Sequence, residues 1–491
     1  MNEHHYIACD LGAESGRVIL GCLREGKVAL EEVHRFPNGA VKISGTLRWD
    51  VLRIFDELKT GLRKIAARGV AAHSVSVDSW GLDYVLTGDG QPMLSLPHHY
   101  RDPRTDRPYA AALQSPGPEL IFAETGIQFM SINTLYQLLA EQERSPRLLE
   151  IAERFLTIAD YLHFLFNGVA VIEESLASTT QLYNAATRAW SERLIGTFGL
   201  PQKIFPPIVP SGTRLGALLP EVALELDAGA IEVIATCSHD TGAAVAAVPA
   251  SGDDWAYLSS GTWSLIGVEL PAPLITAAAR THNFTNEAGF GGTTRFLKNI
   301  VGLWLLQESR RAWTREGHEY NYGTLTTQAE HAEPFRSLIN PRDPRFLRPD
   351  DMPEKIAACC RETGQPEPET PGQFTRCIYE SLALLYARTL GEIEQVTGRA
   401  IARLHIVGGG SQSRLLNQFA ASATGRTVLA GPVEATALGN VLLQAVTLGH
   451  LASLQALREV VRASFEIERY EPQDQAAWPQ AAARFASLPG G

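Results

Sequence analysis

The sequence predicts an α/β fold of two related lobes, residues 1–249 and 250–491. Short apolar runs typical of strands alternate with stretches whose apolar residues recur every three or four positions, which favours mixed α/β architecture. A glycine hairpin opens each half: Gly12 lies in the first turn and Gly261 in the second, about half the chain apart. Because a pattern repeated at such a distance indicates duplication, we expect two similar lobes that meet near the polar turn at 249–253.

The first lobe begins with a strand, a glycine turn and a second strand. A helix capped by Asp50 follows, with apolar positions at Leu52, Phe55, Leu58, Leu62 and Ile65. The expected strands are 6–9, 18–20, 74–77 and 231–235, with the turn at 12–16 and a further helix opening at Asp240.

The second lobe repeats the hairpin at 255–267. Thr370 and Gln373 have the spacing of a capping box for a long helix that Gly398 ends. The strand 404–407 runs into three glycines, and a helix should begin at Gln412. The proline-rich stretch 315–371 is expected to form surface excursions and short helices, and its role is not predicted.

Composition excludes several classes of protein. The chain is 45% hydrophobic and 20% charged, and 43 basic residues against 54 acidic ones give a net charge of −11. An acidic surface disfavours nucleic acid as a partner, and no apolar run reaches the ~18 residues that span a bilayer. The six cysteines form no CxxC pair, and the N-terminus lacks the basic and apolar regions of a secretory signal. We therefore expect a cytoplasmic enzyme with neither a membrane nor a nucleic-acid partner.

The first glycine turn has the residue types of a phosphate site. It comprises Ala13, Glu14, Ser15, Gly16 and Arg17, directly after a strand that ends near Asp10. Free backbone N–H groups, a hydroxyl and a cation suit phosphate, and Asp10 could hold Mg²⁺ through water. An ordinary β-hairpin turn is the alternative interpretation.

Two other segments suit a sugar and its activation. Residues 78–83 combine carboxylates with an indole, and Trp80, Gly81 and Asp83 could bind hydroxyls and an apolar sugar face, or form a solvated turn. Asp240 follows a strand and opens a helix, so it could take a proton from a hydroxyl, or it could cap the helix.

The glycines at 408–410 open a helix in the second lobe. A helix N-terminus of this kind could cradle a nucleotide, although an ordinary glycine turn has the same sequence.

Taken together, these segments resemble the FGGY family of carbohydrate kinases over residues 6–446. The resemblance rests on the segments at 10–17, 78–83, 100–105, 125–129, 133–137, 238–241, 260–264, 294–299, 302–305, 408–410 and 434–440. It implies two actin-like, ribonuclease H-like lobes with ATP and sugar in a cleft between them.

The resemblance also implies roles for residues. Asp240 would be the catalytic base, and the sugar would lie against Gly81, His239, Asp240 and Thr241. The segment 13–17 would bind phosphate, and ATP would contact Thr262, Asn299, Gln307 and Gly409. Glu14 departs from the small or hydroxyl residue expected there, and because a carboxylate repels a triphosphate, we expect it to point away from the nucleotide.

The reaction implied is transfer of the ATP γ-phosphate, with Mg²⁺, to the 1-hydroxyl of L-rhamnulose. Alternatives are a kinase for L-fuculose or D-xylulose, a non-catalytic sugar sensor or an actin-like ATPase. Asp240 together with both glycine turns favours a kinase, and the lack of a basic patch disfavours a gene-regulating sensor. The oligomeric state is not predicted.

Overall fold

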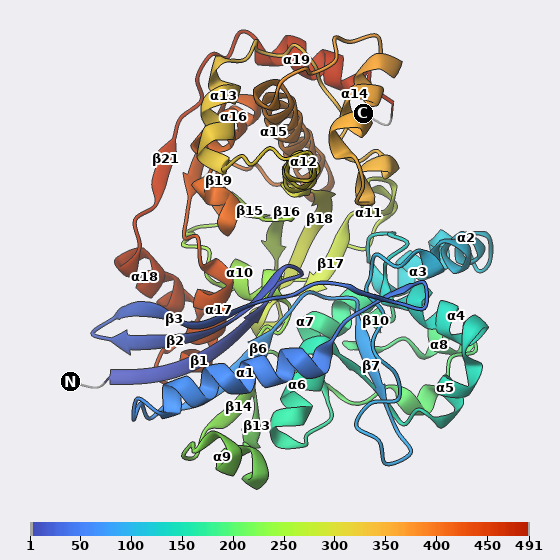
Figure 1. The fold of residues 1–491 in the computed structure, drawn as a ribbon, viewed down its shortest axis with the longest axis vertical. Helices are drawn as coiled ribbons and strands as arrows, with labels where there is room; N and C mark the ends of the chain where they lie inside the picture. Colours follow the sequence, from blue (N-terminus) through green and yellow to red (C-terminus); the bar gives the residue numbers. More distant parts are fainter. Residues whose placement is uncertain (1–2, 490–491) are drawn as a thin grey trace. The chain divides into compact units, whose positions relative to one another are not determined.

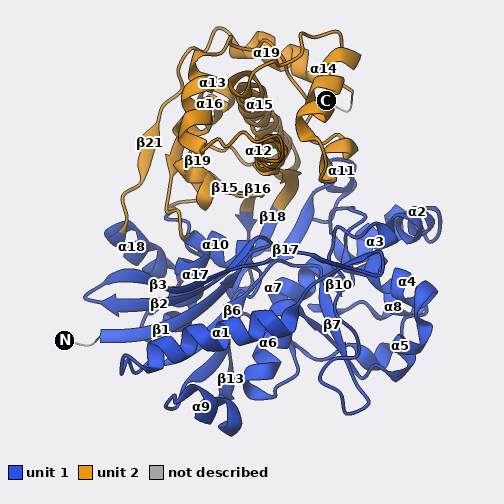
Figure 2. Ribbon diagram, viewed as in Figure 1, with its two compact units in different colours: residues 1–249, 269–296, 435–464 blue, residues 250–268, 297–434, 465–491 orange. Residues whose placement is uncertain are grey.

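A computed structural model describes residues 3–489, which pack as two compact units (Figure 2). Unit 1 contains residues 1–249, 269–296 and 435–464, and unit 2 contains residues 250–268, 297–434 and 465–491. These units are defined by packing, whereas the lobes predicted above are continuous in sequence. The division into lobes 1–249 and 250–491 therefore stays a prediction.

The first sheet has six strands in the order β13-β14-β6-β1-β2-β3 (Figure 1). Its strands are β1 (Glu3–Leu11), β2 (Ser15–Arg24), β3 (Lys27–Pro37), β6 (Ser74–Asp78), β13 (Thr213–Ala217) and β14 (Glu232–Ala235). β1 is antiparallel to β2 and parallel to β6, and β6 is parallel to β14. The strands expected at 6–9, 18–20, 74–77 and 231–235 are confirmed.

Helices cover both faces of this sheet. Gly61 of α1 (Val51–Ala66) lies against Val18 of β2, and Gly21 of the same strand lies against Val441 of α17 (Ala435–Thr447). Because residues 18 and 21 differ by an odd number, they face opposite sides of the strand. α6 (Ile158–Asn167) also packs on β6, and α10 (Asp240–Ala246) packs on α17.

The helix α1 is capped as expected, since the Asp50 side chain accepts a hydrogen bond from the Arg53 N–H at 3.2 Å. One predicted core position is wrong. Leu52 is 54% exposed, and the buried stripe includes Val51 and Ile54 instead. A stripe that begins at Leu52 and one that begins at Val51 both fit a three- to four-residue period, and the packing of the helix on the sheet decides which stripe is buried.

The second sheet has the order β17-β18-β16-β15-β19-β20-β21. Its strands are β15 (Trp255–Ser260), β16 (Trp263–Leu270), β17 (Thr285–Ala288), β18 (Thr294–Val301), β19 (Arg403–Val407), β20 (Thr427–Ala430) and β21 (Glu468–Tyr470). The run β18-β16-β15-β19-β20 repeats the run β3-β2-β1-β6-β14, with the hairpin antiparallel and the next strands parallel. The expected pair of lobes with one topology is thus confirmed.

Unit 2 is built around the 27-residue helix α15 (Pro371–Thr397). The Thr370 hydroxyl accepts from the Gln373 N–H at 3.3 Å, and Gly398 ends the helix with a φ of 70°. α16 (Arg414–Thr424) begins two residues after the predicted Gln412, because residues 409–412 form a 3₁₀ turn, η6 (Gly409–Gln412). The stretch 315–371 contains α13 (Tyr322–His331), η5 (Pro344–Leu347) and α14 (Met352–Glu362).

The remaining elements are short. In unit 1 they are β4 (Val41–Ile43), β5 (Thr46–Arg48), β7 (Tyr84–Thr87), η1 (Pro103–Thr105), α2 (Asp106–Gln114), α3 (Pro118–Thr125), α4 (Thr134–Arg144), α5 (Pro146–Ile151), β8 (Arg154–Thr157), β9 (Ile172–Glu173), α7 (Glu174–Ala177), η2 (Ser178–Thr180), β10 (Tyr183–Asn184), β11 (Ala189–Trp190), α8 (Glu192–Thr197), η3 (Gln202–Ile204), β12 (Ile208–Val209), α9 (Pro220–Leu226), α11 (Ala277–Thr281), η4 (Phe290–Gly292) and α18 (Leu454–Ser464). In unit 2 they are α12 (Trp304–Arg315) and α19 (Trp478–Ala486). Among the described residues, no helix is both long enough and apolar enough to cross a membrane.

Candidate active site

Three carboxylates of unit 1 gather where parallel strands end. Asp10 and Asp78 are direct partners at the carboxyl ends of β1 and β6. The chain beyond β6 then pairs with the segment before α10: the Ser79 N–H donates to the Ser238 carbonyl, and the Asp240 N–H donates to the Ser79 carbonyl, both at 2.9 Å. Asp240 is thereby held beside the other two acids, at the sheet edge where open α/β sheets place ligands.

Asp78 is fully buried. Its Oδ2 accepts from Asn440 Nδ2 of α17 at 2.6 Å, while its Oδ1 has no hydrogen-bond partner. Burial raises the pKa of Asp78 well above its usual value, and the negative charges of Asp10 and Asp240 raise it further. A buried carboxylate oxygen without a donor, among other acids, has the chemistry of a cation site.

Asp240 is the accessible member of the three, with 31% of its side chain exposed. Its Oδ1 accepts from the Thr241 N–H at 2.5 Å and from the Thr241 hydroxyl at 3.1 Å. Desolvation by the surrounding protein raises the pKa of Asp240, and the nearby His239 and these hydrogen bonds oppose that rise. A carboxylate that is reachable and of increased proton affinity is suited to accept a proton from a hydroxyl.

His239 is fixed next to Asp240 by a buried ionic group. Arg295 Nη2, on a side chain with no exposed surface, donates to His239 Nδ1 at 3.1 Å, and Glu287 Oε2 lies 3.1 Å from Arg295 Nη1. The same Glu287 oxygen lies 3.3 Å from His239 Nδ1. In the tautomer in which Nδ1 accepts from this guanidinium, the ring proton is on Nε2, 3.4 Å from Asp240 Oδ1.

Glu173 orders the loop that carries Ser238 and His239. This buried carboxylate accepts from the Ser175 N–H at 2.9 Å and the Ser238 N–H at 3.0 Å, and also from the hydroxyls of Ser175 and Ser211. The Ser175 oxygen accepts from the His239 N–H at 3.0 Å. Burial raises the pKa of Glu173, and its four donors oppose the rise.

The first glycine turn is tied down by Asn38. Its side chain donates to the Gly12 carbonyl at 2.8 Å, and its N–H donates to the Glu14 carbonyl at 2.9 Å. Glu14 is exposed at the turn, near Ala13 and Ser15, which are half-buried. Gly16 is required by packing, because a Cβ there would lie 2.2 Å from the Phe36 ring.

Arg17 lies among acids. Its Nη2 forms an ion pair with Asp10 Oδ2, and its Nη1 lies 3.8 Å from Glu32 Oε2. Asp10 and Arg17 are also direct partners in the β1–β2 pairing. The guanidinium expected to face phosphate therefore also neutralises the carboxylate expected to hold Mg²⁺ through water.

Residues 78–83 form an anchored aromatic loop. Asp83 Oδ2 accepts from the indole N–H groups of Trp49 at 2.6 Å and Trp80 at 3.0 Å and from the Tyr100 N–H at 3.2 Å, while Oδ1 accepts from Gln137 Nε2 at 2.8 Å. The two indoles lie 4.2 Å apart. Asp83 is fully buried, so its observed contacts fix the indoles. Gly81 is close-packed, since a Cβ there would lie 2.8 Å from Thr179 Oγ1.

Unit 2 brings its own candidate residues to one end of the second sheet. The Thr262 carbonyl accepts from the N–H groups of Gly302 and Trp304, which places the β15–β16 turn at the start of α12, one turn before Gln307. Gly410 packs on Ser260, at the end of β15, whereas a Cβ at Gly409 would meet open space. Gln307 Oε1 is buried without a hydrogen-bond partner, and Asn299 is half-buried in β18.

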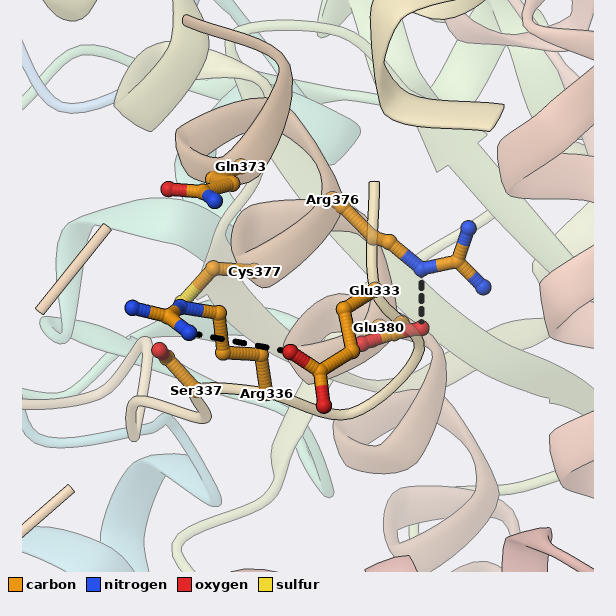
Figure 3. A pocket seen from close by; sticks show the side chains of 7 residues that line it. All are labelled: Glu333, Arg336, Ser337, Gln373, Arg376, Cys377 and Glu380. Atoms are coloured by element: carbon orange, nitrogen blue, oxygen red, sulfur yellow. Dashed lines mark hydrogen bonds and ion pairs between the residues drawn. The ribbon is translucent and has the colours of Figure 1, made fainter. Parts of the chain in front are cut away.

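A separate polar group lines a small cavity in unit 2 (Figure 3). Arg376 Nε donates to Glu380 Oε1 at 2.7 Å, the Phe335 N–H donates to Glu380 Oε2 at 2.9 Å, and Arg336 lies 3.6 Å from Glu333. The cavity volume is about 10 Å³, which is room for one water molecule. None of the residues predicted for catalysis or binding lies in it.

Sequence reasoning missed the residues that hold the site together. Glu173, Glu287 and Asn38 carried no signal, because isolated polar residues on separate elements have no spacing to recognise. Arg295 and Asn440 lie within segments that carried the family resemblance, 294–299 and 434–440, but neither was assigned a role there.

The chain matches models of a known protein family and several curated relatives. Residues 5–247 match the N-terminal domain of the FGGY family of carbohydrate kinases, and residues 256–448 match its C-terminal domain. A rhamnulokinase from Bacteroides thetaiotaomicron is 44% identical, covering 98% of this chain and 99% of its own, and one from Bacillus subtilis is 40% identical, covering 96% of each.

Solved structures share the fold. A xylulose kinase from Lactobacillus acidophilus has a TM-score of 0.80 at 15% identity, covering 99% of this chain and 96% of its own. The Plasmodium falciparum glycerol kinase solved with ADP has a TM-score of 0.77 at 15% identity, covering 98% of each chain. Both lobes, the paired glycine turns and the full-length identity lead to one conclusion: the chain belongs to the FGGY family of carbohydrate kinases.

Proposed function

We propose that this chain transfers the γ-phosphate of ATP to the 1-hydroxyl of L-rhamnulose, giving L-rhamnulose 1-phosphate and ADP. The position of Asp240, an accessible carboxylate of raised pKa at the head of α10 beside His239, carries the proposed chemistry. The sugar follows from the relatives named rhamnulokinase, at 40–44% identity over nearly the whole chain.

In this proposal Asp240 is the catalytic base. Its carboxylate accepts the proton of the sugar hydroxyl, and Thr241 and the Ser79 carbonyl keep it in place through the bonds described above. His239 binds the sugar through its Nε2 side, and Arg295 is a positioning residue that sets the orientation of that ring. Phosphoryl transfer depends on such alignment more than on covalent help from the protein.

Trp80 and Gly81 are proposed to line the sugar site. Asp83 was expected to contact the sugar directly. Because both of its oxygens are engaged by protein donors, we propose that it acts by fixing the two indoles.

In unit 1, residues 13–17 are proposed to bind phosphate through their backbone N–H groups. In unit 2, the residues proposed to contact the nucleotide are Thr262, Asn299, Gln307 and Gly409. The unpartnered Gln307 oxygen and the open space over Gly409 fit a ligand that brings donors and needs close backbone approach.

Mg²⁺ fits the acids of unit 1. Hard divalent cations prefer carboxylate and water oxygens, and the unpartnered Oδ1 of Asp78 lies near two other carboxylates, those of Asp10 and Asp240. Asp10, through water, and Asp78 would hold the ion, which would supply positive charge against the phosphate oxygens. Repulsion among these carboxylates favours a cation between them, because the cation would neutralise their charges.

Two measurements test the proposal. Release of ADP is followed with L-rhamnulose, L-fuculose and D-xylulose, and clear preference for a sugar other than L-rhamnulose would refute the assigned substrate. Asp240→Asn should lose ~10²–10⁴-fold in turnover and retain sugar and ATP binding by calorimetry. Asp253→Asn, at an exposed acid, is the control. Near-normal turnover of Asp240→Asn would remove Asp240 from the role of base.

A further inference from the structure

Three histidines gather at the opposite end of the first sheet from the carboxylates. His4 lies near the start of β1, His73 directly precedes β6, and His450 follows α17. Asp10 and Asp78 end the same two strands, six and five residues further on. At ~3.3 Å per residue the histidines are roughly 17–20 Å from the acids, so they form a site of their own.

Their nitrogen atoms are spaced for a shared ligand. One ring nitrogen from each histidine lies within 4.8 Å of the other two. His4 Nδ1 and His73 Nε2 are 3.4 Å apart. Two nitrogens bound tetrahedrally to Zn²⁺ at ~2.05 Å are about 3.3 Å apart, which is nearly the same separation.

Neighbouring groups orient two of the rings. Tyr6 Oη lies 2.6 Å from His450 Nδ1, and the His5 carbonyl oxygen lies 3.3 Å from His73 Nδ1. When Nδ1 donates to such an oxygen, the lone pair is on Nε2, which is how proteins commonly prepare a histidine for a metal. The donor atoms are therefore supported by a second layer of contacts.

The backbone explains why the three rings meet. Residues 4 and 6 of β1 share one face, so His4 and Tyr6 both point toward the loop after α17. That loop turns at Gly449, whose φ is 77°, and the His450 N–H donates to the Ala445 carbonyl at 2.9 Å. Local backbone geometry on two elements thus fixes the position of His450 beside β1.

A shared cation accounts for the gathering of these rings, because three neutral imidazole nitrogens can bind one ion. The His4 and His450 rings are stacked with centroids 3.7 Å apart. Both rings are half-buried, and binding one ion through a nitrogen of each would separate them.

We propose that His4, His73 and His450 bind a divalent transition-metal ion of the zinc class, with water as the remaining ligand. Nitrogen ligands favour zinc over Mg²⁺, which selects carboxylate and water oxygens. The ion links the start of β1, the entry to β6 and the end of α17. Its role is structural, because it joins three segments of unit 1 that are far apart in sequence.

A neighbouring group on the other face of β1 provides an internal comparison. Glu3, His5 and Cys22 also lie within 4.8 Å of one another. His5 Nε2 is 3.1 Å from Glu3 Oε1, and Cys22 Sγ donates to the same oxygen at 3.3 Å. This group offers a carboxylate, one imidazole and a thiol, whereas the three histidines offer three imidazole nitrogens, and the Cys22→Ser control below distinguishes the two groups.

The test is titration of the purified full-length chain with Zn²⁺ alone, without nucleotide, by calorimetry and by thermal unfolding. One equivalent should bind and raise the melting temperature. Co²⁺ should give the visible absorption of a four-coordinate site. His73→Ala, at an exposed residue, should weaken Zn²⁺ binding at least ~10-fold and abolish the thermal shift.

Two variants serve as controls. His331→Ala removes an exposed histidine whose Nδ1 lies 2.8 Å from a backbone carbonyl oxygen, as that of His73 does at 3.3 Å, and Cys22→Ser removes a donor of the other group. Both should bind Zn²⁺ as the unmodified chain does. Absence of binding in the unmodified chain, unchanged affinity in His73→Ala, or loss in Cys22→Ser would each overturn the proposal.

Discussion

The contact between α17 and α10 allows no side chain at Gly439. A Cβ there would lie 1.9 Å from the Ala243 carbonyl oxygen and 2.4 Å from its carbon. Ordinary contacts begin at 3.4 Å, so Gly439→Ala forces the two helices apart by about 1.5 Å. The clash is with backbone, which no change of side-chain rotamer relieves.

This clash determines how much unfolding free energy the substitution should remove. Overpacking a core costs ~1–3 kcal/mol, and the gain in helix propensity from glycine to alanine returns up to about 1 kcal/mol. Because the clash is severe, we expect the unfolding free energy to fall by about 2 kcal/mol or more. α10 begins at Asp240, and α17 carries Asn440, the donor to Asp78. A displacement of this size should therefore lower turnover about 10²-fold.

Urea unfolding and ADP release measure the two effects. Gly196→Ala is the matched control, since Gly196 lies in the helix α8 of the same unit, is exposed, and has no atom within 4 Å of the place that a Cβ would take. It should gain up to about 1 kcal/mol and keep full activity. If Gly439→Ala were as stable and as active as Gly196→Ala, the inferred contact between the helices would be wrong.

Three further predictions concern charged side chains of unit 1. Burial raises the pKa of Asp83 to about 6 from 3.8, so its contribution to stability is fully present below pH 3.8 and is lost as the pH rises through about 6. Asp83→Asn should remove that slope from urea midpoints and cost about 2 kcal/mol at acidic pH, because its amide N–H groups face other donors; an unaltered slope would contradict this. Glu287→Gln should destabilise the chain by about 3 kcal/mol in urea, since it removes the carboxylate beside buried Arg295, and full stability would show that the pair is dispensable. Arg17→Gln should raise the KM for ATP if the guanidinium faces phosphate, whereas an altered Mg²⁺ requirement at unchanged KM would show that it serves Asp10 alone.

Local sequence signals predicted the elements that local chemistry determines. Asp50 and Thr370 cap their helices, Gly398 ends one, and the two glycine hairpins start the two sheets. Each of these caps, helix ends and turns depends on residues at most four positions apart, so it can be recognised from the sequence. The shared strand order of the two sheets then confirmed the duplication that Gly12 and Gly261 indicated.

Long-range packing decided what the sequence left open. Gly16 lies in a turn whose sequence suits phosphate binding, yet packing alone requires a glycine there, because the Phe36 ring occupies the place of a Cβ. Asp83 was expected among sugar ligands because its segment combines carboxylate acceptors with an indole, yet its donors come from residues 49, 80, 100 and 137. The sequence shows that a carboxylate can accept hydrogen bonds, but which donors lie within reach of it depends on the fold.

The chain is acidic overall, and three of its acids form a cluster in unit 1. Asp10, Asp78 and Asp240 lie together. Burial and the charges of Asp10 and Asp240 raise the pKa of Asp78, while the hydrogen bond from Asn440 and the charge of Arg17 lower it. These acids repel one another and would also repel a triphosphate, which is the physical reason for proposing a cation among them. Arg17 offsets part of that charge by pairing with Asp10. In the proposed function these acids favour the binding of a divalent ion, and Asp240, accessible and of raised proton affinity, is proposed to accept the proton of the sugar hydroxyl.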